Sequence, residues 1–186
     1  MEFTETLIQG RLIRRYKRFL SDIEITGDGG ALTEITAHCP NPGAMLGLSA
    51  PGSDVWVSPA NNPKRKLQYT WEIIRVGDHH VGINTGLPNA LVDEALAADH
   101  IAELTSYESR RREVKYGTGS RIDLLLEKES GERCYVEVKN TTLAEGDRAL
   151  FPDAVTTRGK KHLLELAEVV AQGHRGVMLF CVSRGD

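Results

Sequence analysis

The sequence has few cysteines and no long apolar run. Its three cysteines are widely spaced and form no C-x-x-C pair, which argues against a disulfide framework and against a zinc site. The longest apolar stretch, near Val177–Val182, is far too short to span a bilayer. The N-terminus M-E-F-T-E lacks the basic and apolar regions of a signal peptide. These absences fit a protein of the reducing cytoplasm without a membrane partner.

The sequence also lacks a strong excess of either charge. Its net charge is −3, so a polyanionic partner would have to bind local basic patches. With 186 residues and a 40% apolar share, the chain is long enough for one large or two small domains, each with its own core. We find no internal repeat and no segment of low complexity. The chemistry of the protein must therefore be sought in local clusters.

The N-terminal part is rich in short strands separated by turn residues. Many short strands at close spacing predict a small barrel, and the OB-fold is the smallest common one. We expect this OB-like barrel to occupy residues 1–82. Its predicted strands are Leu7–Ile13, Phe19–Ile25, Leu32–Ala37, Val55–Val57 and Leu67–Val76.

One basic cluster stands out within the predicted barrel. Arg14, Arg15 and Arg18 surround Tyr16 and Phe19. Basic residues interleaved with aromatic ones suit a groove that follows phosphates and stacks bases, which predicts DNA binding. The alternative is a solvated strand edge that charge keeps soluble.

Breakers in Gly82–Pro88 predict a crossing into a second domain, residues 83–186. Asn89 is expected to cap a helix that runs to about Tyr107, with Glu94 in its first turn. A hairpin, a second helix and a buried strand over Gly176–Val182 follow. This order predicts a mixed α/β domain.

The second helix is strongly periodic. Its predicted apolar side carries Leu163, Leu166, Ala167 and Val170. A polar stripe is expected on the other side, made of Arg158, Lys161, His162 and Glu165. The basic residues near the helix start add to the attraction that a helix N-terminus has for anions.

The stretch Ser120–Asn140 carries the most specific chemical signal. Two apolar runs flank Gly131, which predicts a β-hairpin that turns about Ser130. That turn would place Asp123 across the ladder from Glu137, where like charges repel. A divalent cation would neutralise them, because carboxylate and carbonyl oxygens are its preferred ligands.

This pattern resembles two known groups of proteins. An Asp, a later E-x-K on the partner strand and a following basic helix resemble the PD-(D/E)xK nuclease superfamily. The motifs H-C-P-N-P-G-A-M, N-T-G-L-P-N, S-R-I-D, C-Y-V-E-V-K-N-T-T-L and F-P-D-A-V-T-T-R-G-K-K-H-L-L-E-L resemble the sugar fermentation stimulation protein (SfsA) family. The resemblance implies an OB-like barrel joined to a PD-(D/E)xK nuclease-like domain, and binding of DNA without sequence preference.

The resemblance also implies roles for individual residues. Asp123, Glu137 and the carbonyl of Val138 match the ligands of a magnesium or manganese ion. Lys139 matches the lysine that positions or activates the attacking water, and Glu94 is the candidate for an auxiliary helix acid. The residues expected to contact phosphate near the scissile bond are Arg158, Lys161 and His162.

Three functions stay open at this point. The first is a DNA-binding protein with a magnesium-dependent endonuclease site. The second is a non-catalytic DNA-binding regulator of sugar or maltose metabolism with a vestigial metal site, because any exposed strand can carry an E-x-K pattern. The third is a barrel that binds a small ligand or protein.

The oligomeric state is equally open, with a homodimer among the alternatives. Family members usually continue for some tens of residues with another acidic and apolar segment, whereas this chain ends at Asp186. We therefore expect either a truncated chain or the absence of the last elements.

Overall fold

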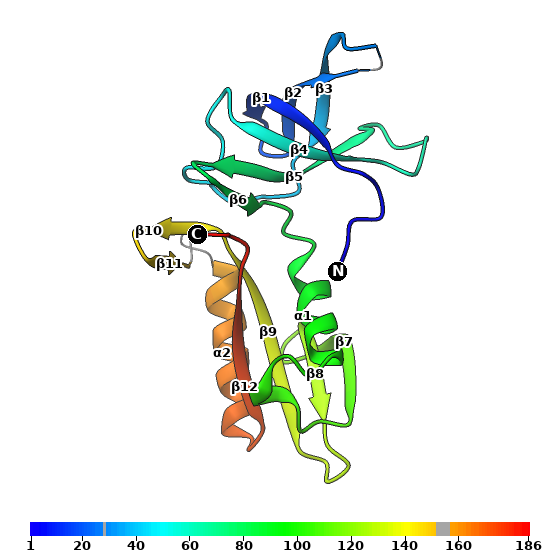
Figure 1. Cartoon of the computed structure of the whole chain (residues 1–186). Coiled ribbons are helices and arrows are strands. Elements are labelled where there is room, and N and C mark those ends of the chain that lie inside the picture. Colours follow the sequence, from blue (N-terminus) through cyan, green and yellow to red (C-terminus); the bar gives the residue numbers. More distant parts are fainter. Residues whose placement is uncertain (28, 152–156) are drawn as a thin grey trace. The chain divides into compact units, whose positions relative to one another are not determined.

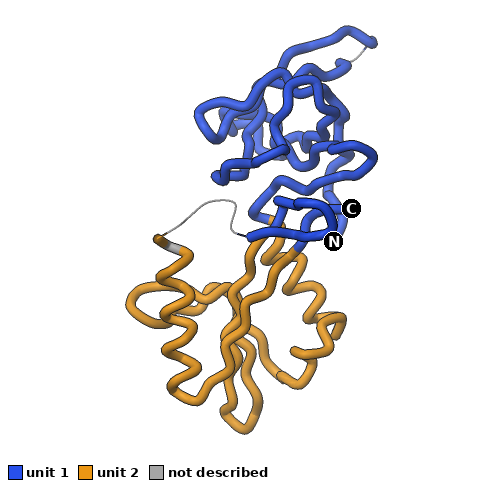
Figure 2. Tube along the Cα trace, turned by 90° about the vertical axis from the view of Figure 1, so that its left-hand side faces the viewer, with its two compact units in different colours: residues 1–86, 141–154, 182–186 blue, residues 87–140, 155–181 orange. Residues whose placement is uncertain are grey.

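The computed structural model describes residues 1–27, 29–151 and 157–186, with the exception of the Arg158 side chain. The chain forms two compact units (Figure 2). The first comprises Met1–Gly86, Thr141–Ala154 and Val182–Asp186, and the second comprises Leu87–Asn140 and Val155–Cys181. The sequence predicted a single boundary between residues 82 and 83. The first unit also includes two short segments from the later part of the chain. None of the helices described is long and apolar enough to cross a membrane.

The first unit is built around a barrel (Figure 1). Its strands follow the order β3-β2-β1-β4-β5, and a parallel pairing of β3 with β5 at His38 and Thr70 closes the ring. Strand β6 extends the sheet from β5, and β10 and β11 form a separate hairpin. This arrangement confirms the predicted OB-like fold. The strands are β1 (Ile8–Tyr16), β2 (Leu20–Thr26), β3 (Leu32–His38), β4 (Asp54–Pro59), β5 (Tyr69–Val76), β6 (His79–Gly82), β10 (Leu143–Glu145) and β11 (Arg148–Leu150).

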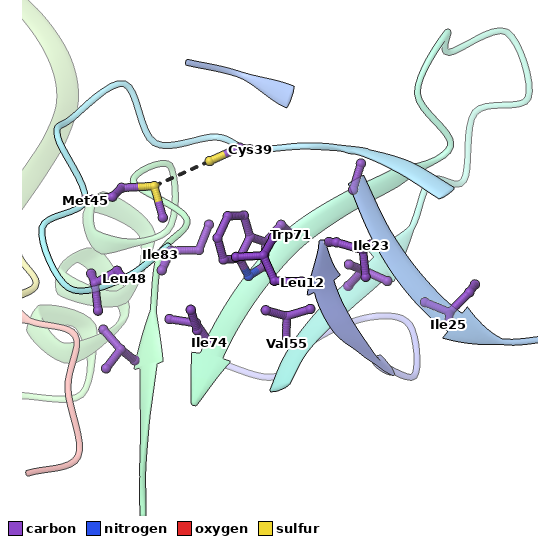
Figure 3. Close-up of a cluster of buried hydrophobic side chains, with 13 residues drawn as sticks. Leu12, Ile23, Ile25, Cys39, Met45, Leu48, Val55, Trp71, Ile74 and Ile83 are labelled. Carbon is purple, nitrogen blue, oxygen red and sulfur yellow. Dashed lines mark hydrogen bonds between the residues drawn. The ribbon is translucent and has the colours of Figure 1, made fainter. Parts of the chain in front are cut away.

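The barrel interior is filled by side chains that alternate along the strands (Figure 3). Leu12, Ile23 and Val55 are almost completely buried there. Trp71 lies in the same core, and its indole N–H donates a hydrogen bond to the carbonyl of Ile73 over 2.9 Å. The largest buried side chain therefore also has its polar group satisfied, which makes the core specific as well as apolar.

The second unit is a sheet with a helix on each face. The sheet has the order β12-β9-β8-β7 among the described strands. Helix α1 packs Val92 and Leu96 against Leu124 and its neighbours on one face, while α2 packs Leu166 and Val169 against the other. The predicted mixed α/β domain is confirmed. Its elements are α1 (Pro88–Ala97), the short 3-10 helix η1 (Ala102–Leu104), β7 (Ser109–Tyr116), β8 (Ser120–Glu127), β9 (Arg133–Thr141), α2 (Thr157–Ala171) and β12 (Arg175–Val182).

Helix α1 begins earlier and ends earlier than the sequence predicted. Leu87 occupies the N-cap position and Pro88 follows it, so Asn89 lies inside the first turn and does not cap the helix. Proline is pre-organised for the first helical position, which explains this start. The helix stops at Ala97, because the chain reverses through Asp99, whose φ is 54°.

The predicted faces of α2 are wrong in part. Leu163 and Val170 were expected on the buried side, but they are 52% and 51% exposed. His162 and Glu165, expected on a solvated stripe, are buried beside Leu166. His162 contacts Glu137 of β9 and Glu165 accepts a hydrogen bond from Thr118 in the β7–β8 turn, so the helix can turn this side inward.

Gly10 offers a test of how tightly the barrel strands approach each other. A Cβ atom at this position would lie 2.6 Å from the carbonyl oxygen of Glu24 and 2.8 Å from methyl groups of Ile23 and Ile25. We expect Gly10→Ala to lower the free energy of unfolding by about 1–3 kcal/mol, as overpacking does. Urea denaturation measures this change. Gly82→Ala is the control, because its Cβ would meet nothing closer than 3.6 Å; an equal loss in both variants would contradict the prediction.

Candidate active site

The hairpin β8–β9 forms as predicted. Gly131 takes a φ of 88° in its turn, and the N–H of Lys128 donates to the carbonyl of Glu132 over 2.9 Å. The paired residues of the two strands run from Glu127–Arg133 at the turn to Leu124–Val136. Asp123 and Glu137 are the next residue on each strand, so the hairpin brings these two carboxylates to neighbouring positions.

Asp123 is held by two elements. Its Oδ2 accepts a hydrogen bond from the backbone N–H of Val138 on β9 over 2.7 Å. Its Oδ1 accepts one from the side-chain amide of Asn89 on α1 over 2.8 Å. The carboxylate thus replaces a partner in the strand ladder and at the same time connects the sheet to the start of the helix.

The environment of Asp123 disfavours its charge. Burial raises the pKa of this carboxyl, and the nearby charge of Glu137 raises it further. The hydrogen bonds from Val138 and Asn89 and the charge of Lys139 act in the opposite direction without offsetting the increase. An added positive charge at this position would therefore stabilise the ionised carboxylate.

Glu137 is only 2% exposed, and its two oxygens differ. Oε1 accepts a hydrogen bond from Nζ of Lys139 and is in contact with Nδ1 of His162. Oε2 is buried without a hydrogen-bond partner among the residues described. A buried carboxylate oxygen without a partner is costly, so this atom marks a place where a ligand would be favourable.

Helix α2 is fixed by a second buried acid, Glu165. Its Oε1 accepts hydrogen bonds from the N–H and the hydroxyl of Thr118 over 3.0 and 3.1 Å. Hydrogen bonds from Ser120 and Thr118 lower the pKa of Glu165 and keep it ionised. Gly117 is required in this turn, because a Cβ there would lie 2.8 Å from Oε1 of Glu165 and its φ is 54°. The β7–β8 turn thereby holds His162 of the same helix against Glu137.

The predicted phosphate-binding residues of α2 lie in different environments. His162 is buried and turned toward Glu137, which suits a residue that orients the carboxylate better than one on the surface. Lys161 is exposed, but its Nζ donates to the carbonyl of Thr118 over 3.1 Å and lies 3.6 Å from Glu165. The side chain of Arg158 lies outside the described part of the structure.

On α1, the side chain of Asn89 reaches Asp123, and the sequence did not predict this contact. Glu94 is exposed on the helix surface, and its neighbour Asp93 forms an ion pair with Arg110. Sequence reasoning missed the role of Asn89 because it assigned the residue to the helix cap. The signal in the sequence was Pro88, which favours the first helical position. Asn89 then does not cap the helix, and its side-chain amide can bind Asp123.

The three arginines predicted to bind DNA in the barrel also differ. Arg14 donates to the buried carboxylate of Asp22 over 2.8 Å. Arg15 donates to two carbonyls of the loop Asn41–Gly43 over 2.9 and 3.0 Å, so its guanidinium fixes the loop. Arg18 is exposed in the turn between β1 and β2, with a φ of 65°. Arg14 and Arg18 are thus exposed, whereas Arg15 is half-buried.

The donor set at the hairpin fits a hard divalent cation. No group of three or more His, Cys, Asp and Glu side chains in the described residues is placed to hold a metal ion. Two carboxylates and one backbone carbonyl remain, from Asp123, Glu137 and Val138, and the unpartnered Oε2 of Glu137 belongs to this set. Magnesium binds in this way, with few protein oxygens and several positions left to water or substrate.

Comparisons with known proteins agree across the chain. A family model described as the SfsA N-terminal OB domain matches residues 13–83, and one described as the sugar fermentation stimulation protein RE domain matches residues 86–186. A sugar fermentation stimulation protein homolog from Paramagnetospirillum magneticum is 55% identical over all of this chain and 77% of its own. One from Geobacter sulfurreducens is 58% identical over 97% of this chain and 75% of its own.

A solved structure is similar as well. It is described as Pyrococcus furiosus SfsA in complex with Ca2+, with a TM-score of 0.86 and 26% sequence identity. The match covers 98% of this chain and 75% of that one. The similarity therefore extends over both units.

Because burial disfavours the charge of Asp123, removing this charge is expected to stabilise the folded protein. In the presence of a chelator, we expect Asp123→Asn to raise the free energy of unfolding at neutral pH, because an amide carries no charge into the buried site. Asparagine can still accept the hydrogen bond from Val138. The pKa of Asp123 is raised on folding, so the gain is present above the folded pKa and disappears below about pH 4, the ordinary value of an aspartate.

Urea denaturation from acid to neutral pH measures this difference. Glu129→Gln is the control, since Glu129 is exposed in the turn of the same hairpin. A loss of stability in Asp123→Asn at neutral pH, or a gain that is the same at every pH, would contradict the expectation.

Proposed function

Because the chain belongs to the sugar fermentation stimulation protein (SfsA) family, we propose that it binds DNA without sequence preference and hydrolyses phosphodiester bonds with a divalent cation in its second unit. The observation that carries this proposal is the unpartnered, buried Oε2 of Glu137 beside Asp123. A cation at this point would satisfy the free oxygen and neutralise both carboxylates.

The Pyrococcus furiosus relative supports the choice of ion. Its structure is described as a complex with Ca2+, a cation that prefers oxygen ligands as magnesium does. In this chain, Asp123, Glu137 and the carbonyl of Val138 would hold the ion. When bound, it would polarise the phosphoryl oxygen and lower the pKa of a bound water.

Lys139 and His162 prepare Glu137 for this role. Both contact Oε1, so the second oxygen of the carboxylate is left to face a ligand. In this proposal, Lys139 positions the reacting groups and stabilises the negative charge that develops on the phosphate.

A second candidate is a DNA-binding regulator whose site no longer turns over. One observation favours it: Lys139 and His162 already partner one oxygen of Glu137, so the protein itself compensates part of the buried charge. The two candidates share the bound DNA and differ only in hydrolysis. Cleavage measurements therefore separate them.

The hydrolysis experiment uses supercoiled plasmid with magnesium or with a chelator. We expect nicking that requires magnesium and falls by about 100-fold or more in Asp123→Ala and in Lys139→Ala, the usual loss for a group that stabilises transition-state charge. Lys128→Ala is the control, because this lysine lies near the hairpin turn and pairs with Glu132. Equal nicking in all variants indicates a contaminating nuclease, and intact DNA binding without nicking favours the second candidate.

Asn89 tests the metal site without any substrate. We expect Asn89→Ala to weaken divalent-ion binding by about 10–100-fold, since groups that orient a ligand have effects of this size. The increase in melting temperature with added manganese measures the binding, because an ion that binds only the folded state stabilises it. Asn61→Ala, in an exposed loop of the first unit, should behave like the wild type. An unchanged manganese response in Asn89→Ala would refute this role for Asn89.

A further inference from the structure

Two cations face each other on the strands that carry the site. Lys115 of β7 is paired directly with Arg121 of β8, and both side chains are exposed. Like charges at such positions repel each other. Within the described residues neither side chain forms an ion pair, and Arg121 donates only to the carbonyl of Glu113 over 2.7 Å. Among the described residues, no acidic side chain therefore offsets the repulsion between Lys115 and Arg121.

Both cations lie on the face of the sheet that carries α1. Val114 and Ile122 pack in the cluster formed with α2. Their neighbours Lys115 and Arg121 therefore point to the opposite face, because side chains alternate along a strand.

Two further arginines lie on this face, because Glu113, with a φ of 54°, interrupts the alternation between Arg112 and Val114. Arg112 is paired with Leu124, which packs in the cluster formed with α1. Arg110 and Arg112 both reach Asp93 of α1, Arg112 over 3.9 Å. We define the β7–β8 strip as Arg110, Arg112, Lys115 and Arg121.

The strip leads to the candidate active site. Arg121 precedes Asp123 by two residues, which is about 7 Å along a strand. Asp123 is bound by Asn89 from α1, the helix on the same face as the strip. From Arg110 to Lys115 the strip spans about 17 Å. This length corresponds to about five phosphates of one DNA strand, at a rise of roughly 3.4 Å per nucleotide.

We propose that the β7–β8 strip binds the sugar–phosphate backbone of DNA and guides it to Asp123. This inference rests on the proposed function and gives its substrate a path on the second unit. A phosphate between Lys115 and Arg121 would neutralise their repulsion.

The test measures the salt dependence of binding. Fluorescence anisotropy with a labelled DNA duplex, in a chelator so that no cleavage occurs, gives the binding constant over a range of salt concentrations. Each phosphate contact contributes about 0.9 to the slope of log K against log salt. We expect Lys115→Ala/Arg121→Ala to lower this slope by about 1.8 and to weaken binding by about tenfold or more at low salt.

The control is Lys128→Ala/Arg133→Ala, which removes the same charge near the turn of the β8–β9 hairpin, where Lys128 is half-buried and Arg133 is exposed. Its slope should stay near that of the wild type. Folding is checked by the melting temperature, which removal of a repulsive pair should leave unchanged or raise. The single variant Lys115→Gln should lower the slope by about half as much as the double variant.

Each outcome decides one of the two proposals. Equal slopes for the strip variant and the wild type, with DNA still bound, overturn the strip and leave the proposed function intact. Equal losses in the strip variant and the control also overturn it, because the effect is then one of total charge. A wild-type protein that binds no duplex DNA at low salt overturns both.

Discussion

The buried proximity of Asp123 and Glu137 is the constraint on which the second unit depends. Two carboxylates at neighbouring positions of a hairpin, one of them almost inaccessible, cannot be held in an apolar core without partners. The surrounding elements supply those partners separately. Helix α1 and strand β9 bind Asp123, while Lys139 and helix α2 bind Glu137. The sheet and both helices are therefore tied together by the same two acids.

The polar side of α2 follows from this constraint. A helix over a polar hairpin end must present groups that can bind it, and His162 does so. Glu165 then fixes the helix to the β7–β8 turn through Thr118, and Gly117 leaves the space that this contact needs. Oε2 of Glu137 is one of the buried oxygens without a hydrogen-bond partner among the described residues, and it belongs to the carboxylate that the hairpin places beside Asp123.

Local rules predicted the fold well because they depend on neighbours in sequence. The period of two and the positive φ of Gly131 were sufficient to align Asp123 with Glu137, and the spacing of short strands was sufficient for the barrel. The same rules failed where a distant partner decides. His162 looked solvated because Glu137 is 25 residues away in sequence, and Arg15 looked available because the loop that it binds lies 26 and 28 residues away. Periodicity measures apolar surface and cannot detect a buried polar contact.

Strand β8 carries two unfavourable pairs of opposite sign. Asp123 lies next to the acid of β9, and Arg121, two residues earlier, lies opposite the base of β7. Either pair alone would weaken the sheet. Together, the two pairs are complementary to a phosphodiester with a bound divalent cation. The phosphate would lie near the basic side chains and the cation near the carboxylates. Under the proposed function, binding of this ligand would recover the free energy that the two pairs cost the sheet.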